Sequence, residues 1–363
     1  MTDFKTTHND SLQQILAEFK TSLHLNQLEV GPLGQPITIQ FYEKWLAENN
    51  HGSMNYLKEH LDMKKNPQIL HAGLRTVISV AQSYFPAVEP TVEKNPARVA
   101  VYAQNNDYHY WLKEKLIKIV NGLAAHYPSE VFLPFVDSGP VLERNWAYQN
   151  SLGWFGKNTC ILHPQHGSLF FVAEILTTLP YDAPAHLPLP DFCGTCRKCI
   201  DICPTQALIK PRELKADLCI SYLTIESKST PSIDLRSKMG DWFFGCDLCQ
   251  TVCPWNEKVF RQNKISPTHE TSTELKLNLS EIERAQLIDY FRWLLTASHK
   301  QIQKKVSGTA LARPGAKGLK RNALIVIANR DLHELQPEVE KLKLEELIEL
   351  KDWALDQLVN NKT

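Results

Sequence analysis

The sequence predicts a mixed α and β fold in three parts: an α/β unit over residues 1–180, a small cysteine-rich unit over residues 181–260, and a helical region over residues 261–363. Three observations support this division. Strand-like and helix-like stretches mix before residue 180, eight of the nine cysteines lie between residues 193 and 253, and helical periodicity dominates the remainder. The proline-rich segment 179–190 is expected to be a linker.

Hydrophobic periodicity predicts the elements of the first part. Helices are expected within residues 1–30 and over 37–49, 54–63 and 108–126, and buried strands over 76–84, 98–103, 131–136, 159–162 and 168–178. The Asp137-Ser-Gly-Pro140 segment predicts a turn after the third of these strands. Residues 219–226 alternate in polarity and predict another strand. In the last part, helices are expected over 281–295, 319–329 and 342–359, the last two as an antiparallel pair.

Composition and charge narrow the class of protein. The chain has 363 residues and a formal net charge of zero, so its overall charge favours no nucleic-acid partner, and such a partner would need a local basic patch. Because the N-terminus is polar and no apolar run is long enough to cross a bilayer, we expect a cytoplasmic protein in which cysteines stay reduced. The sequence contains no GxGxxG or P-loop motif, which disfavours a nicotinamide or nucleoside triphosphate.

Two cysteine runs carry the strongest chemical signal. The first is C-x-x-C-x-x-C-x-x-x-C-P over residues 193–204, and the second is a lone Cys219 followed by C-x-x-C-x-x-x-C-P over 246–254. In two-cluster ferredoxins the fourth cysteine of each run binds the other cluster. The spacing therefore predicts two [4Fe–4S] clusters. One takes Cys193, Cys196, Cys199 and Cys253, and the other takes Cys203, Cys219, Cys246 and Cys249. Zinc sites and disulfides are weaker alternatives, because eight cysteines in two interleaved sets fit neither well.

Three further features each allow two interpretations. Asp137 ends a predicted buried strand, so it is either a half-buried acid that donates a proton near neutral pH or a turn-forming aspartate. The Gly153–Asn158 loop lets the backbone approach a flat or anionic ligand, or is an ordinary turn. Cys160, outside both runs, is expected to be a buried free thiol.

A basic stretch without acidic residues runs from Ala297 to Arg321. Such a stretch suits contacts with a phosphate backbone, and a solvated charged face is the alternative. The candidate phosphate-binding residues are Lys300, Lys304, Lys305, Arg313, Lys317, Lys320 and Arg321.

Together these motifs resemble the epoxyqueuosine reductase family, the cobalamin-dependent iron–sulfur enzymes of queuosine formation in tRNA. The resemblance rests on segments 136–144 (VDSGPVLER), 152–159 (LGWFGKNT), Gly167-Ser168 with Glu174, the cysteine run 193–205, segment 219–226 (CISYLTIE) and segment 245–256 (GCDLCQTVCPWN). Asn150-Ser151 and residues 227–232 depart from the family pattern and affect only the expected shape of local loops.

The resemblance implies a cobalamin-binding domain like that of reductive dehalogenases, a ferredoxin-like domain with two clusters, and a HEAT-like C-terminal region that contacts tRNA. It implies that Asp137 protonates the departing epoxide oxygen, that electrons come from a low-potential donor of unknown identity, and that the protein is a monomer. The expected cobalamin contacts are Tyr102, Asp107, Asp137, Lys157, Asn158, Ser221, Tyr222, Leu223, Thr224 and Asp247.

Two other functions remain open from sequence. One is a cobalamin iron–sulfur reductase of a small molecule, such as a dehalogenase, and the other is a plain two-cluster electron carrier. A histidine ligand to cobalt is disfavoured, because the nearest approach to the D-x-H-x-x-G pattern, Asp331-Leu-His333, lacks its glycine and lies in the helical tail.

Overall fold

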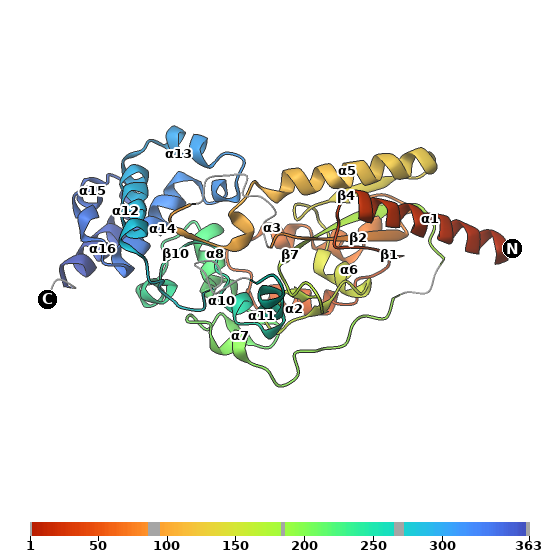
Figure 1. The fold of residues 1–363 in the computed structure, drawn as a ribbon, viewed down its shortest axis with the longest axis horizontal. Coiled ribbons are helices and arrows are strands. Elements are labelled where there is room, and N and C mark those ends of the chain that lie inside the picture. Colours follow the sequence, from red (N-terminus) through yellow and green to blue (C-terminus); the bar gives the residue numbers. More distant parts are fainter. Residues whose placement is uncertain (1, 86–94, 183–185, 265–271, 361–363) are drawn as a thin grey trace.

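The computed structural model describes residues 2–85, 95–182, 186–264 and 272–360 (Figure 1). The predicted linker 179–190 therefore lies partly outside the described residues. Among the described residues, no helix is both long and apolar enough to cross a membrane.

A four-stranded sheet forms the centre of the first part, in the order β1-β2-β7-β4. The strands are β1 (Gln27–Pro32), β2 (Thr76–Ser83), β4 (Phe132–Phe135) and β7 (Phe170–Thr177), and every neighbouring pair is antiparallel. The β-branched run of β2 is buried from Thr76 to Ala81, as its composition predicts. Because no neighbouring strands of this four-stranded sheet are parallel, the rule that ligands bind at the carboxyl ends of parallel strands does not apply to it.

Helices cover both faces of this sheet. On one face, α1 (Thr2–Ser22) and α5 (Tyr108–His126) share a hydrophobic core with β1, β2 and β7 (Figure 1). On the other face, α6 (Glu143–Gln149) places Trp146 and Ala147 against β2 and β7. The remaining elements of this part are α2 (Ile39–Ala47), α3 (Tyr56–Glu59), α4 (Leu61–Lys65), η1 (Pro67–Ile69), β3 (Arg98–Val99), η2 (Val101–Ala103), β5 (Trp154–Phe155) and β6 (Ile161–Leu162).

Most predicted elements of this part are confirmed, and three differ. Residues 27–32, expected within a helical region, form the edge strand β1. The helix expected over 54–63 is broken at His60 into α3 and α4. Only Arg98 and Val99 of the strand expected over 98–103 are extended, and the chain then turns through η2.

The cysteine-rich part consists of short elements, which leave the loops free to carry thiols. They are α7 (Lys198–Asp201), β8 (Leu208–Lys210), β9 (Glu213–Leu214), η3 (Ala216–Leu218), α8 (Ile220–Ile225), α9 (Ile233–Arg236), η4 (Ser237–Met239), β10 (Trp242–Phe244), α10 (Leu248–Thr251) and α11 (Pro254–Gln262). The strand expected over 219–226 is wrong. Cys219 precedes helix α8, in which the Thr224 hydroxyl donates to the Ile220 carbonyl one turn earlier at 2.8 Å.

The last part is helical, as predicted. Its elements are α12 (Glu281–Thr296), α13 (His299–Val306), η5 (Ala310–Ala312), α14 (Gly315–Asn329), η6 (His333–Leu335), α15 (Gln336–Lys341), η7 (Glu345–Leu347) and α16 (Ile348–Asn360). Helix α13 was not predicted, although Ser298 and Gln301 form a capping box at its start.

One hydrophobic core joins all three parts. It contains Val99 of β3, Phe243 of β10 and Phe291 of α12, together with most of the buried face of α14 and α16. Strand β10 also pairs with β3 in parallel, so a segment of the first part is built into the other two. The core contains residues from either side of positions 180 and 260. The domain boundaries predicted there stay a prediction.

Candidate functional site

The thiols of the cysteine-rich part gather in two groups. Burial, followed by the neighbouring thiols of Cys253, Cys193 and Cys196, raises the pKa of Cys199 to about 11. These four are called the first thiol group. Cys253 lies about fifty residues after the other three in the sequence, so it joins them only because the chain folds back to the first cysteine loop.

The second thiol group consists of Cys203, Cys219, Cys246 and Cys249. Burial raises the pKa of Cys249 well above its ordinary value, and Cys246 and Cys219 are among its neighbours. Cys203 is in turn a neighbour of Cys219. The two groups have the same members as the two ligand sets expected from sequence, and their role as cluster ligands stays a prediction.

Each thiol group has four members, which is the number of thiolates that a cubane cluster binds. Among the described residues, no three His, Cys, Asp or Glu side chains are grouped so that they could hold one metal ion. A cubane binds each thiolate through a different iron, so its four sulfurs stay farther apart than the ligands of one zinc ion. Because burial favours the protonated thiols, binding iron must release protons from them.

The β5–β6 turn ties the sheet unit to both thiol groups. Lys157 Nζ donates hydrogen bonds to the carbonyls of Gly194 (2.6 Å) and Cys196 (2.8 Å) in the first loop. Asn158 Nδ2 donates to the carbonyl of Cys249 at 3.3 Å. Both residues are expected to contact cobalamin, which stays a prediction, and within the protein their polar atoms bond to the cysteine loops.

Cys160 lies between the two groups. Burial raises its pKa to about 12, and its thiol neighbours are Cys253 and Cys199 of the first group. It is also a neighbour of Cys249 in the second group. It forms no disulfide, which agrees with the expected free thiol.

Asp137 lies just beyond strand β4 with a positive φ of 52°. Its carboxylate accepts a short hydrogen bond from the Tyr108 hydroxyl at the start of α5, and it lies 3.9 Å from His109 Nε2. The side chain is 62% exposed, so the expectation of a half-buried acid is wrong. The positive φ turns the carboxylate out of the sheet towards α5.

Tyr108 and His109 hold this acid in place, and each of them is itself held by another residue. Burial raises the pKa of Tyr108, and the Asp137 carboxylate raises it further, so the phenol stays protonated and donates. Tyr108 stacks on Phe171 of β7 with ring centroids 3.9 Å apart. Asp107, the N-cap of α5, holds His109 Nδ1 at 2.7 Å.

Several predicted contacts meet around Tyr102. Burial raises its pKa, and its charged neighbours are Asp247, Asp137, Glu226 and Asp107. Asp247 itself accepts from the backbone nitrogen of Val101 at 2.7 Å. The structure thus brings together four predicted residues from three separate segments, where the sheet unit meets the second thiol group.

Helix α8 contributes mainly internal contacts. Tyr222 has its hydroxyl 2.7 Å from the backbone nitrogen of Ser53, Leu223 is buried, and Thr224 accepts from Gly245 N at 2.9 Å. Ser221, half-buried, is the remaining predicted contact on this helix.

The basic stretch does not form a single surface. Arg321 is 2% exposed and donates to the carbonyls of Leu223 and Ser227, so it cannot contact phosphate and its assignment to tRNA is wrong. Lys320 caps the end of α12 through the carbonyls of Leu295 and Ala297, both at 2.9 Å.

The other basic side chains are exposed. Arg313 pairs with Glu226 at 3.0 Å, and Lys317 with Glu346 at 3.3 Å. Lys300, Lys304 and Lys305 lie exposed on α13.

The C-terminal helices reach the Asp137 region through the loop after α13. The backbone nitrogen of Asp107 donates to the carbonyl of Gly308 at 2.8 Å, and Asn106 forms a β-bridge with Thr309. Glu226, Arg313 and Asp137 are charged neighbours of Tyr56. Sequence reasoning missed Tyr56 and Glu226, because only the fold places them beside Asp137.

Two further acids near Asp137 were not singled out for chemistry. Glu174 is fully buried in β7, and Glu143 begins α6. Burial, followed by Asp137, raises the pKa of Glu143 to about 7. Burial, Glu143 and Asp137 also raise the pKa of Glu174 well above its ordinary value. The sequence does contain a signal for Glu174, because it is an acid inside the otherwise mostly apolar strand β7.

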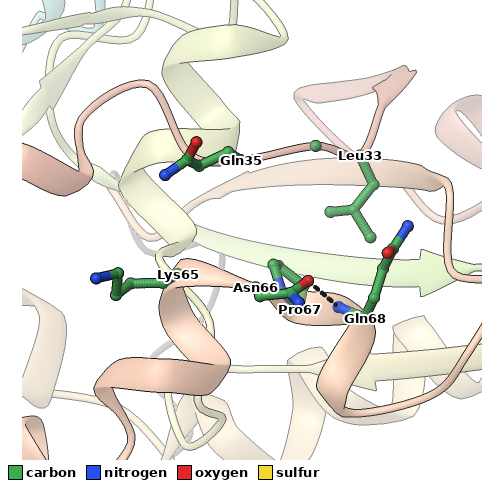
Figure 2. A pocket seen from close by; sticks show the side chains of 7 residues that line it. Leu33, Gln35, Lys65, Asn66, Pro67 and Gln68 are labelled. Carbon is green, nitrogen blue, oxygen red and sulfur yellow. Dashed lines mark hydrogen bonds between the residues drawn. The ribbon is translucent and has the colours of Figure 1, made fainter.

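A separate hollow of about 360 Å³ opens between the end of β1 and helix α4 (Figure 2). Leu33, Gln35, Lys65 and Gln68 are among its lining residues. None of the predicted site residues lines it, and Lys65 is paired with Glu43 at 2.7 Å.

Two family models match this chain. The 4Fe-4S double cluster binding domain matches residues 192–256, and the model described as "Epoxyqueuosine reductase QueG, DUF1730" matches residues 64–138. The first match covers both cysteine runs, and the second includes Asp137.

Curated relatives and solved structures agree with these matches. The epoxyqueuosine reductase of Cellulophaga algicola is 36% identical over 77% of this chain and 86% of its own length. That of Escherichia coli is 35% identical over 88% and 82%. A structure of epoxyqueuosine reductase with an epoxyqueuosine-modified tRNA stem loop has a TM-score of 0.79 at 24% identity, covering 96% of this chain and 90% of that one. The Streptococcus thermophilus structure gives 0.77 at 22% identity, with the same coverage.

Proposed function

The chain belongs to the epoxyqueuosine reductase family, and on that premise we propose that it reduces the epoxide of epoxyqueuosine to queuosine at the wobble position of tRNA. The observation that supports this most is the proximity of two groups of four thiols to a face that presents Asp137 under a hydrogen bond from Tyr108. Iron–sulfur clusters transfer single electrons, and the acid on that face supplies a proton.

Each thiol group would hold one [4Fe–4S] cluster. The second group has Asp247 as a charged neighbour of Cys246 and Cys249, and Asp247 is also a neighbour of Tyr102, so this group lies on the side of the Tyr102 face. Electrons from a low-potential donor would therefore enter at the first group. They would leave from the second group, beside Asp247 and Tyr102.

The face around Tyr102 fits cobalamin in the chemistry of its side chains. It offers the Tyr102 ring and the carboxylates of Asp107 and Asp137, which suit the amide-rich edge of a corrin. Asp247 is 3% exposed and would act from below, by holding the backbone nitrogen of Val101. Lys157 and Asn158 would act indirectly, by holding the cysteine loops. Cobalamin bound there would deliver electrons to the epoxide carbon.

The chain's own residues handle the proton and the substrate. Tyr108 and His109 would hold the Asp137 carboxyl towards the epoxide oxygen, to which it gives its proton. The RNA would lie across the exposed lysines of α13, which are joined to α5 through Gly308. We further propose that residues 1–180 form the cobalamin-binding domain, that the C-terminal region is HEAT-like, and that the protein acts as a monomer.

The proposal is tested with protein reconstituted anaerobically with iron, sulfide and cobalamin, and with an RNA stem loop that carries epoxyqueuosine. Mass spectrometry should show the modified base losing one oxygen atom. Asp137→Asn should retain its iron and its corrin absorbance but lose turnover, whereas the exposed acid variant Asp62→Asn should behave as wild type. Full turnover by Asp137→Asn would remove it as the acid, and an unchanged RNA mass with the wild type would refute the function.

A further inference from the structure

Glu174 is a carboxyl group buried without a partner. It is 0% exposed in the middle of β7, opposite Ser79 of β2 and Phe135 of β4. Neither of its carboxyl oxygens has a hydrogen-bond partner among the described residues. The nearby Asn150 amide donates instead to Ser79 Oγ at 3.0 Å.

Such a position determines the charge of the group. A carboxylate in an apolar interior loses its hydration and gains nothing here in return, so the group keeps its proton. Burial is the main reason that the pKa of Glu174 lies well above its ordinary value, and the carboxylates of Glu143 and Asp137 add to it. A neutral acid thus lies within the electrostatic reach of the proposed proton donor.

Glu143 is an electrostatic neighbour of both the buried acid and Asp137. It is half-buried at the start of α6, which packs on the face of β7 that carries Glu174. The other charged groups near Glu143 are Lys64 of α4 and Arg144 of α6. On the far side of Asp137 lie Tyr108 and His109 of α5.

The proposed reaction needs more protons than one acid holds. Converting an epoxide to an alkene breaks both carbon–oxygen bonds, forms the carbon–carbon double bond, and releases the oxygen as water. This consumes two electrons, which the low-potential donor supplies through the clusters, and two protons. The Asp137 carboxyl carries one proton at a time, and bound RNA would separate it from bulk water.

We propose that Glu174 and Glu143 supply the second proton, passing it to Asp137 from inside the protein while the substrate covers the outer face. The inference rests on the proposed function. Neither acid touches the substrate, and both act through Asp137. His109 is the alternative source, from the solvent side, since its Nε2 lies 3.9 Å from Asp137.

Infrared spectroscopy tests the proton on Glu174 without any turnover. Cluster-loaded protein at about pH 9, where Glu143 and Asp247 have lost their protons, should show the band of a protonated carboxyl group that shifts in D₂O. Glu174→Gln should lose this band. Glu29→Gln is the matched control and should keep the band. Glu29 lies on β1 in the same row of the sheet, opposite Ser79, but unlike Glu174 it has basic neighbours, His186 and Lys20. A band that survives in Glu174→Gln would overturn the proposal.

Turnover tests the destination of the proton. With eight irons and unchanged RNA affinity, Glu174→Gln should lower kcat about 100-fold, the low end for loss of a positioned acid. It should also shift the pH profile and enlarge the solvent isotope effect. Glu143→Gln, at a half-buried position that tolerates the amide, should do the same, and Glu174→Asp should restore part of the rate.

The remaining outcomes separate the two proposals. Unchanged kcat and pH profile in both glutamine variants would overturn the proton supply while leaving the function intact. A lower kcat in His109→Gln, with normal kcat in Glu174→Gln and Glu143→Gln, would also overturn the proton supply by these two acids. The second proton would then come from the solvent side. An inactive wild type would overturn the function itself and, with it, the need for a second proton.

Discussion

The ammonium group of Lys157 lies 2.8 Å from the backbone carbonyl oxygen of Cys196, so a side chain of the sheet unit holds the first cysteine loop. Lys157→Met should loosen this loop, because a hydrogen bond from a charged group contributes about 1.5–3 kcal/mol. We expect iron and sulfide analysis to show partial loss of one cluster. Lys210→Met, which affects only an exposed pair with Glu213, should retain full iron. Equal iron in both variants would contradict the role of Lys157.

Cys219→Ser should affect only the second thiol group, since Cys219 is a neighbour of Cys203, Cys246 and Cys249. Iron content should fall towards half, and the electron paramagnetic resonance signal of one cluster should remain. Cys160→Ser is the matched control and should retain all the iron, because Cys160 belongs to neither group. Loss of iron from both groups in Cys219→Ser would contradict the partition.

Reversing two charges on α13, Lys300→Glu with Lys304→Glu, should weaken binding of the tRNA stem loop. The slope of log affinity against log salt should become shallower by roughly 0.7–0.9 for each phosphate that α13 no longer neutralises. The control is Lys341→Glu at the end of α15. Affinity that does not change would move the RNA site away from α13.

Arg321→Met should destabilise the protein by at least about 2 kcal/mol, because it leaves the carbonyls of Leu223 and Ser227 buried without donors. Urea unfolding measures this change. Lys317→Met, which removes only an exposed pair with Glu346, should cost about 0–1 kcal/mol. An Arg321 variant of normal stability but weakened RNA binding would contradict the structural role.

Glu143 should make stability depend on pH. Its pKa is raised from 4.5 to about 7, so between these values the folded chain holds a proton that the unfolded chain has released. The free energy of unfolding should therefore fall as pH rises through this window, and Glu174 adds in the same direction. Glu143→Gln should flatten the decline measured by urea unfolding at about pH 5 and about pH 8. The exposed variant Glu59→Gln should leave it unchanged.

Local sequence signals predicted most elements of the fold. The apolar stripe of α5 and the β-branched run of β2 are confirmed at almost the predicted residues. The prediction failed where tertiary contacts decide. Residues 219–226 alternate like a strand, yet form α8, because the buried Thr224 side chain bonds within the helix and to Gly245. Nor could periodicity show that all neighbouring strands of the main sheet are antiparallel.

The candidate site was predicted to a similar extent. The cysteine spacing identified both thiol groups, and the segment after β4 pointed to Asp137. Charge composition misled in the basic stretch, because a sequence does not show that Arg321 faces inward to satisfy carbonyls. Nor does the sequence show that the Asp137 side chain is exposed, because this depends on the positive φ that turns it outward.

Strand β10 ends at Phe244, with only Gly245 between it and Cys246. Its Phe243 and Phe244 are fully buried in the core formed with the C-terminal helices. If oxygen destroyed a cluster at the second thiol group, the damage would therefore also affect the packing of the neighbouring core. It would loosen the same aromatic layer on which α12 and α14 are packed. A chain exposed to air should then bind RNA more weakly as well as lose iron.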